Sequence, residues 1–260
     1  MLFRSGGAAR GFAHIGVISV LQEAGIKPDL VVGTSAGSLV AALYASGKTP
    51  AQLVQVAMAM DQSAISDWSV PLFGNGVLRG DALAKYVNAQ VGGRSMETLP
   101  MPLGVVATDL RSGQAVLFRT GDTGVAVRAS CSVPAVFTPV RIKGQDYVDG
   151  GLVSPVPVQF ARQMGAQLII GVDISSPPDA NVSTDVFQVL MQTFSIMGRS
   201  LNMHELKDAQ IVVRPDLASV RSTDFSGRQR AIDAGRAAML AALPALKAKL
   251  EAMSTMVPAK

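Results

Sequence analysis

A short apolar strand followed by a serine turn between two glycines constrains the fold of this chain more than any other feature. Leu30–Val32 is a run of large apolar residues, the pentapeptide Gly33-Thr34-Ser35-Ala36-Gly37 follows it, and residues 36–46 have the pattern of a helix. A serine in this strand–turn–helix context is typical of a nucleophile elbow, which lifts the hydroxyl out of the sheet. Gly33 and Gly37 allow a close backbone approach that a side chain would block. The segment therefore predicts an α/β fold in which a candidate nucleophile, Ser35, points its Oγ out of the sheet at a strand end.

Apolar runs and helical patterns alternate along the rest of the chain. We expect strands at residues 2–3, 30–32, 103–108, 114–118, 168–174 and 211–213, and a hairpin around Lys143-Gly144 at residues 141–148. We expect helices at residues 12–24, 36–46, 50–60, 80–91, 158–164, 186–206 and 228–253. The strand–helix–strand–helix opening favours a mostly parallel sheet with helices on both faces.

Composition excludes several classes of protein. The chain has 260 residues, 48% apolar and 16% charged, which is enough apolar material for a large core and unlike a disordered chain. Its only cysteine, Cys131, cannot form a disulfide within the chain. The net charge of +4 is spread without a Lys/Arg run or zinc-finger spacing, so we expect no nucleic-acid partner.

The longest uncharged stretch of the chain is the first candidate for a membrane-spanning helix. Residues 30–47 form this stretch of 18 residues (47 − 30 + 1), which meets the length rule for a spanning helix. Its glycines and serines fit a strand, a tight turn and a buried helix better. The first residues also lack the basic and apolar regions of a secretory signal. We therefore expect a cytoplasmic protein that contacts membranes only peripherally.

A second glycine-rich run, Gly6-Gly7-Ala8-Ala9-Arg10-Gly11, lies between the first strand and the first helix. Consecutive small residues can point successive N–H groups into one concavity that holds an anion. That anion is either a phosphate or the oxyanion of an acyl-transfer intermediate. A dinucleotide site is disfavoured, because it needs an acid at the end of the next strand and that strand ends at Ser35.

The connection between the two runs brings them together. Gly11 and Ser35 are 24 residues apart (35 − 11), which is enough for one helix and one strand. A right-handed crossover of this kind places both turns at the carboxyl edge of adjacent parallel strands. We therefore expect the glycine-rich run and the serine to share one site.

The serine needs a base, and the chain offers two histidines and several carboxylates. His14 is predicted to pack within the first helix and His204 to lie on a solvated helix face, so neither is favoured. Asp149, in Asp149-Gly150-Gly151, follows a short strand, where two glycines allow a close approach to the serine. Burial would raise the pKa of its carboxyl and make it a better base. Asp109 and Asp173 also stand at strand ends, where a turn or cap is the ordinary role.

Three motifs in order give the chain a family resemblance. Ser5-Gly6-Gly7-Ala8-Ala9-Arg10-Gly11, Gly33-Thr34-Ser35-Ala36-Gly37 and Asp149-Gly150-Gly151 resemble the patatin-like phospholipase family, in particular its small bacterial branch related to neuropathy target esterase. Residues 107–110 and 128–134 are also similar to that branch. The resemblance covers about residues 3–215 of a single patatin-like domain, and residues 216–260 are then a helical extension at the C-terminus.

The resemblance implies a fold, a reaction and a set of site residues. It implies a three-layer α/β/α sandwich and hydrolysis of lipid acyl esters by a Ser–Asp dyad, without metal or cofactor. Ser35 would be the nucleophile and Asp149 its base. The N–H groups of Gly6, Gly7 and Ala8 would form the oxyanion hole, which Arg10 and Gly11 support, and Gly33, Gly37, Gly150 and Gly151 would shape the turns. Ala8 departs from the fullest pattern, which has a third glycine there.

The remaining features allow other interpretations. A patatin-like adaptor with little turnover is the alternative to a carboxylic ester hydrolase of phospholipase A or lysophospholipase type. The loop at residues 66–76 contains Trp68 and is either a lipid-touching flap or a packed surface loop. Met191, Met197 and Met203 recur every six residues and are predicted to face the core. Cys131 is predicted to be a small buried apolar residue.

Overall fold

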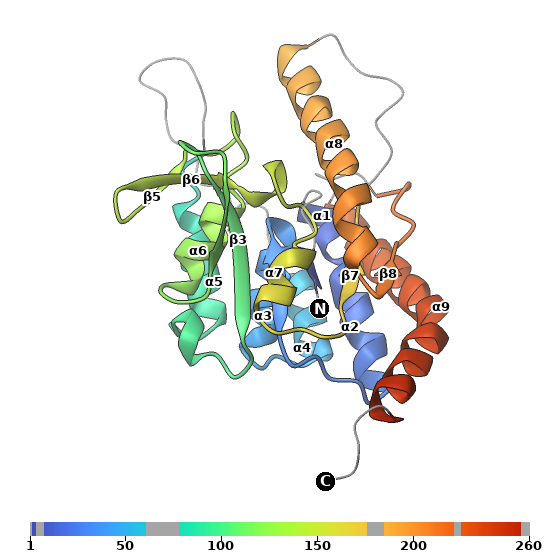
Figure 1. The fold of residues 1–260 in the computed structure, drawn as a ribbon. Helices are drawn as coiled ribbons and strands as arrows, with labels where there is room; N and C mark the ends of the chain where they lie inside the picture. The colour runs from blue at the N-terminus through green and yellow to red at the C-terminus, as the bar shows by residue number, and fades with distance from the viewer. Residues whose placement is uncertain (1, 4–7, 61–77, 176–184, 221–224, 256–260) are drawn as a thin grey trace.

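A mixed β-sheet forms the centre of the molecule (Figure 1). The computed structural model describes residues 2–3, 8–60, 78–175, 185–220 and 225–255. Within these ranges the strands are β1 (Leu2–Phe3), β2 (Val31–Thr34), β3 (Leu103–Asp109), β4 (Ala115–Phe118), β5 (Val140–Ile142), β6 (Gln145–Asp149), β7 (Ile170–Val172) and β8 (Ile211–Val213). Their order across the sheet is β5-β6-β3-β2-β1-β7-β8, and β4 pairs with β3 beside this path.

The strand directions follow from the connections. β1, β2, β3, β7 and β8 are paired in parallel, because helical segments connect most of them. β4, β5 and β6 pair antiparallel, since short turns join β3 to β4 and β5 to β6. The predicted α/β fold class is confirmed, with a sheet that is mixed rather than strictly parallel.

The helices are close to their predicted positions, except that two of them, at residues 8–11 and 123–130, were not predicted. They are α1 (Ala8–Gly11), α2 (Ala13–Glu23), α3 (Ala36–Ala45), α4 (Pro50–Ala59), α5 (Asp81–Gln90), α6 (Thr123–Ser130), α7 (Val158–Gln163), α8 (Val186–Glu205) and α9 (Arg228–Thr255). The sequence analysis missed α6, whose glycine and valines have low helix propensity. Its one local signal is Asp122, the N-cap, whose side chain accepts a hydrogen bond from the Val125 N–H at 2.7 Å.

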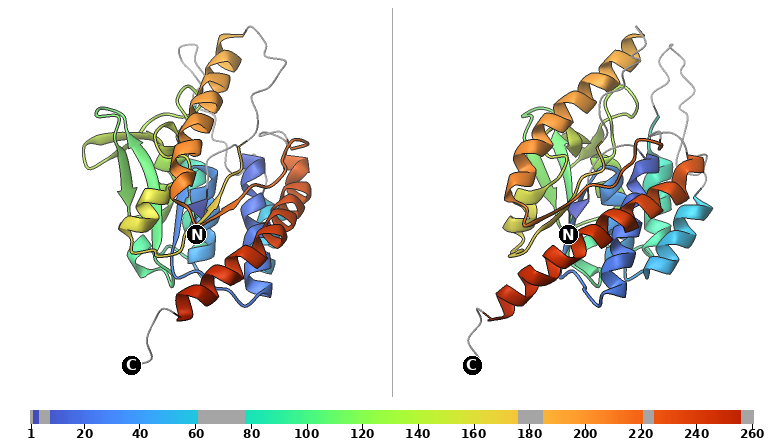
Figure 2. Two further views of the ribbon diagram at one scale, coloured as in Figure 1. Left: turned by 45° about the vertical axis from the view of Figure 1, so that its right-hand side comes forward. Right: turned by 90° about the vertical axis from the view of Figure 1, so that its right-hand side faces the viewer.

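Helices cover both faces of the sheet, as alternate side chains of the central strands show. Val31 and Val105 belong to a large core that includes α2, α3, α4, α5, α6 and α9. Their neighbours Val32 and Val106 point the other way, into a smaller core with α7. Figure 2 shows α2, α4 and α9 on one side of the molecule, and α7 and α8 on the other.

The C-terminal helix α9 packs closely on α2. A Cβ on Gly16 would lie 2.0 Å from the Ile232 carbonyl oxygen, and a Cβ on Gly235 would lie 1.9 Å from that of Ala13. Only glycine permits two helix backbones to approach so closely. Met239 and Leu246 of α9 are fully buried in the larger core. The described part of the C-terminal segment is therefore built into the same core as the sheet.

Helix α8 extends away from the body of the molecule (Figure 1). Several of its apolar side chains are exposed. Met197 and Met203 are 52% and 57% exposed, so the prediction that the methionine stripe faces the core is wrong for these two residues. The reason is the helical period: positions six residues apart advance by about 600°, which spreads them over different faces. Across the described ranges, no helix has the length and apolarity needed to span a membrane.

Candidate active site

Ser35 occupies a strained turn between β2 and α3. Its backbone has φ 53° and ψ −128°, a conformation that side-chain-bearing residues rarely adopt. A Cβ on Gly33 would lie 2.6 Å from both the Gly37 carbonyl oxygen and the Ser38 Cα, so the first glycine is required where the turn folds back on itself. The turn holds the serine at the N-terminus of α3, where the helix dipole favours negative charge.

Sheet register places the end of β6 beside this turn. β3 lies between β2 and β6, with Val106 opposite Thr34 and the next residue, Ala107, opposite Asp149. Two strand spacings amount to about 10 Å, which the emerging serine turn and the two side chains can close. Residues 114 positions apart in the sequence are thus brought together.

The Ser35 hydroxyl donates a hydrogen bond to Asp149 Oδ2 at 2.6 Å. Ser35 and Asp149 are 7% and 3% exposed, so little water competes for this contact. The other carboxylate oxygen, Oδ1, accepts the Gly151 N–H at 2.7 Å. The Thr108 hydroxyl donates to the Asp149 backbone carbonyl at 2.9 Å, which fixes the end of the strand.

The electrostatics of Asp149 follow from its burial. Removal from water raises the pKa of its carboxyl to about 6, while the hydrogen bonds from Ser35 and Gly151 act in the opposite direction. The carboxyl is therefore ionised at neutral pH, but it holds a proton far better than an ordinary aspartate. A group with these properties can take a proton from a hydroxyl and return it.

Gly150 explains why glycine follows the carboxylate. A Cβ at this position would lie 2.2 Å from the Val106 carbonyl oxygen and 3.0 Å from Thr34 Cγ2. The turn after β6 therefore packs directly on the ends of β3 and β2. This close packing, together with the amide of Gly151, sets the direction of the Asp149 side chain.

The structure describes only residues 8–11 of the glycine-rich run at residues 6–11. Gly6 and Gly7 lie outside the described residues, whereas Ala8, Arg10 and Gly11 form α1. Ala8 is helical, a conformation that any L-residue adopts, so its departure from a third glycine demands no positive φ. A Cβ on Gly11 would lie 3.0 Å from the Ala36 Cβ, which places α1 beside the residue after Ser35. Arg10 Nε donates to the Val220 carbonyl oxygen at 2.8 Å, and burial lowers the pKa of its guanidinium.

The other candidates have ordinary roles in the structure. His14 is fully buried in α2, and His204 is exposed near the end of α8. Asp109 accepts hydrogen bonds from the N–H groups of Arg111 and Ser112, as a turn-forming aspartate does. Asp173 accepts hydrogen bonds from the Ser175 N–H and from Asn202 Nδ2, both at 3.0 Å. Neither acid has a hydrogen bond to Ser35 among the contacts of the described residues.

Cys131 lies at the end of α6, near the serine turn. Burial and the nearby carboxylate of Asp149 raise the pKa of its thiol to about 12. Its sulfur is 3.8 Å from the Ser38 hydroxyl, which donates to the Ser35 carbonyl oxygen at 2.6 Å. A raised pKa keeps the thiol protonated at physiological pH, and the protonated form is a poor nucleophile. Among the described residues, no group of His, Cys, Asp or Glu has the arrangement of a metal site.

The sequence analysis missed one polar side chain at the serine turn. Ser130, the last residue of α6, accepts the Ser35 N–H in a hydrogen bond of 2.8 Å. No motif marks this contact, since α6 was not predicted and the residues are 95 positions apart. The sequence analysis used residues 128–134 only as part of the family resemblance, and it gave Ser130 no role.

The structure thus defines an α/β protein in which a buried carboxylate accepts a hydrogen bond from a serine on a strained strand-to-helix turn. The chain belongs to the patatin-like phospholipase family, whose model matches residues 2–162. This finding confirms the resemblance inferred from the three motifs.

Several curated relatives cover much of the chain. It is 28% identical to an uncharacterised NTE family protein of Mycobacterium tuberculosis over 94% of the chain and 46% of that protein. A second such protein of M. tuberculosis is 35% identical over 65% of the chain and 47% of that protein. The mouse patatin-like phospholipase domain-containing protein 6 is 30% identical over 85% of the chain and 16% of that protein. The chain thus spans half or less of the length of these relatives.

A solved structure supports the fold. VipD from Legionella pneumophila superposes with a TM-score of 0.53 and 15% identity, over 92% of this chain and 65% of that one. At this identity the likeness concerns the fold alone.

Proposed function

We propose that the protein is a serine lipid acyl hydrolase, a carboxylic ester hydrolase of phospholipase A or lysophospholipase type. The observation that carries the proposal is the 2.6 Å hydrogen bond from the Ser35 hydroxyl to Asp149 Oδ2 within a buried site. Membership of the patatin-like phospholipase family supports a lipid substrate. Ser35 acts as the nucleophile and Asp149 as the base.

The reaction proceeds in two steps. Asp149 takes the hydroxyl proton as Ser35 Oγ attacks the ester carbonyl, and the N–H groups of Gly6, Gly7 and Ala8 hold the oxyanion. The intermediate collapses to an acyl-serine, and the proton passes from Asp149 to the departing alcohol. Asp149 then takes a proton from water, which attacks the acyl-serine and releases the fatty acid. The serine is restored with its proton.

Two substitutions test the assignment of the dyad. Ser35→Ala and Asp149→Asn should each lower the kcat for a p-nitrophenyl acyl ester roughly a thousand-fold or more. Asp109→Asn is the matched control, because it removes a half-buried carboxylate at the end of the neighbouring strand β3. Turnover that survives in either dyad variant would refute the assignment. His14→Ala should leave most activity per folded molecule, and a loss equal to that of Ser35→Ala would instead indicate a histidine base.

The alternative is an adaptor that keeps the fold without useful turnover. The intact contact between Ser35 and Asp149 favours the enzyme. A fluorophosphonate probe separates the two, because an active serine hydrolase is labelled at Ser35 and a pure adaptor is not. Labelling that persists in Ser35→Ala would place the reactive group elsewhere.

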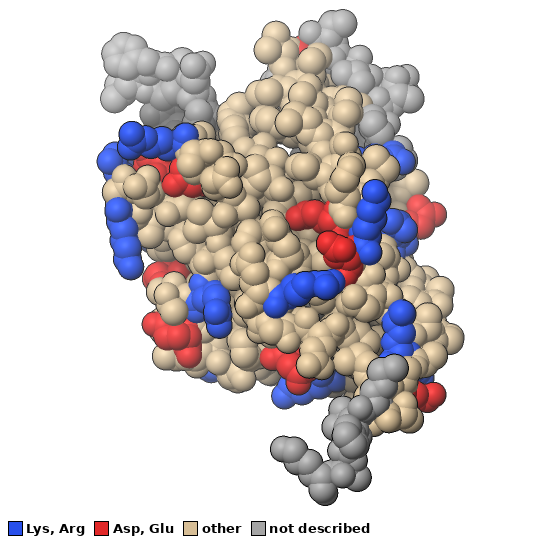
Figure 3. Space-filling view, in the orientation of Figure 1, with Lys and Arg blue, Asp and Glu red and all other residues tan. Residues whose placement is uncertain are grey.

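We further propose that the protein contacts a lipid surface through α8. Residues 186–198 contain no charged side chain, and this part of the helix is uniformly tan in Figure 3. Val189, Ile196 and Met203 are exposed and recur every seven residues, which aligns them on the side of α8 that faces away from the body. An exposed row of apolar side chains on a helix can be partly buried in a membrane interface.

Vesicle binding tests the lipid contact. Ile196→Asp should reduce sedimentation with phosphatidylcholine vesicles about ten-fold or more, because insertion of the helix would then bury a charge. Leu240→Asp on α9 is the matched control, since Leu240 is 52% exposed and Ile196 is 51% exposed. Equal binding of the two variants would exclude α8 as the contact surface.

A further inference from the structure

The hydroxyl of Ser130 bridges the serine turn and the neighbouring strand. It accepts the Ser35 N–H at 2.8 Å and donates to the Val106 carbonyl oxygen at 2.6 Å. Ser130 is fully buried, so water does not compete for either bond. A single side-chain oxygen therefore links the turn after β2 to β3, the strand that lies between the two residues of the proposed dyad.

The orientation of this hydroxyl is determined by its partners. A serine hydroxyl has one hydrogen and two lone pairs. Its hydrogen is committed to the Val106 carbonyl, so a lone pair is turned toward the Ser35 N–H. The backbone of Ser35 has φ 53°, and such a conformation persists only when its surroundings fix it.

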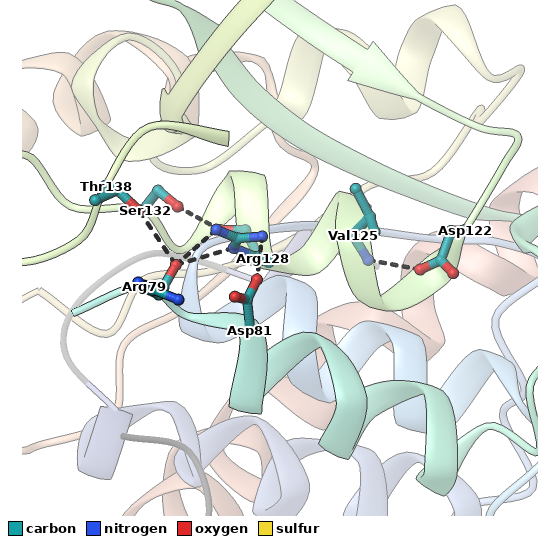
Figure 4. A network of polar contacts seen from close by, with 7 residues as sticks. All are labelled: Arg79, Asp81, Asp122, Val125, Arg128, Ser132 and Thr138. Atoms are coloured by element: carbon teal, nitrogen blue, oxygen red, sulfur yellow. Dashed lines mark hydrogen bonds and ion pairs between the residues drawn. The ribbon is translucent and has the colours of Figure 1, made fainter. Parts of the chain in front are cut away.

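The end of α6 that carries Ser130 is itself held in place (Figure 4). Arg128 Nη1 lies 2.6 Å from Asp81 Oδ1 at the start of α5, and Arg128 Nη2 donates to the Arg79 carbonyl oxygen at 2.7 Å. The Ser132 hydroxyl donates to the Arg128 carbonyl oxygen at 2.8 Å. These contacts fix the last turn of α6 against α5, so Ser130 presents its oxygen from a rigid element.

We propose that Ser130 is a positioning residue for the nucleophile Ser35, an inference that rests on the function proposed above. By accepting a hydrogen bond from the Ser35 amide, Ser130 fixes the strained turn. The fixed turn then directs Ser35 Oγ to Asp149. The same bond occupies the Ser35 N–H, which is therefore no donor to the oxyanion. A misplaced nucleophile slows the chemical step without weakening substrate binding. Loss of the Ser130 hydroxyl should therefore lower kcat and leave KM nearly unchanged.

Removal and retention of the hydroxyl test the proposal. Ser130→Ala should lower kcat for a p-nitrophenyl acyl ester about 10–100-fold with little change in KM, and slow fluorophosphonate labelling of Ser35 to a similar degree. Ser130→Thr retains the oxygen and should recover most of the rate. Ser19→Ala is the matched control: Ser19 is buried, and its hydroxyl donates to a helix carbonyl, that of Ile15, at 2.8 Å.

The outcomes separate this inference from the function on which it rests. Rates are compared per folded molecule, with the melting temperature of each variant measured in parallel. A Ser130→Ala variant within two-fold of the unaltered protein in kcat overturns the positioning role, as does a folded Ser130→Thr variant no faster than Ser130→Ala. Equal losses in Ser130→Ala and Ser19→Ala would also overturn it. An unaltered protein with no turnover and no labelling would instead refute the proposed hydrolase, and the positioning role with it.

Discussion

The buried carboxylate of Asp149 should make the protein less stable at neutral pH than it would be without that charge. Asp149 is 3% exposed, and burial raises the pKa of its carboxyl from the model-peptide value of 3.8 to about 6. An asparagine has nearly the same shape and carries no charge at any pH. Asp149→Asn should therefore abolish hydrolysis and, at the same time, increase the free energy of unfolding.

The magnitude follows from the difference in pKa between the folded and unfolded states. The folded pKa is the higher one, so the folded state binds more protons between about pH 4 and pH 6 and stability falls as pH rises through that window. A difference of about two pKa units corresponds to about 3 kcal/mol above pH 7. The advantage of the asparagine variant should fall to about half at pH 5 and become small at pH 4.

Thermal unfolding of the two proteins at several pH values measures this effect. A gain of about 3 kcal/mol should raise the melting temperature of the variant by about 5–10 °C at pH 7.5. The quantity to compare is the difference between variant and unaltered protein, because other acids, such as Glu23, Glu97 and Asp109, have lowered pKa values and contribute the opposite trend. That trend is common to both proteins and cancels. A variant that is no more stable at pH 7.5, or equally stabilised at pH 4, would refute the reasoning.

Three further expectations follow from the same site. The kcat/KM for ester hydrolysis should rise with pH and reach half its maximum near pH 6, the pKa of Asp149; a midpoint near pH 4 would contradict a buried base. Cys131, whose thiol pKa is raised to about 12, should resist iodoacetamide at pH 8 in the folded protein and react once the protein is unfolded in urea, and rapid native alkylation would be inconsistent with its surroundings. Gly150→Ala should fail to fold or lose activity, since its Cβ would lie 2.2 Å from the Val106 carbonyl oxygen; a normal melting temperature with full kcat would show that the turn relaxes.

Local patterns predicted most of the fold. Strands and helices at residues 30–60, 80–118 and 158–213 follow from short apolar runs, helix periodicity and breaking glycines or prolines, which depend on near neighbours. Helix α6 was missed because its valines and glycine give little helical signal, and its packing on α5 and β3 stabilises it instead. The exposed methionines of α8 were misassigned because residues six positions apart on a helix do not share one face.

The candidate site also combines features that the sequence predicts with features that it does not. The strained turn at Ser35 and its two glycines are encoded within five residues, because a tight strand-to-helix turn has strict steric requirements. Among the acids at strand ends, the two glycines after Asp149 favoured it as the base, and the family resemblance implied the same role.

Only the tertiary structure decided how these groups act. The order of strands, with β3 between β2 and β6, brings a carboxylate to a hydroxyl 114 positions away. Burial beneath the surrounding elements sets the pKa of Asp149, and the end of α6 supplies the oxygen of Ser130. Residue types that permit a turn are a local property, whereas distance, exclusion of water and hydrogen-bond partners exist only once the chain has packed.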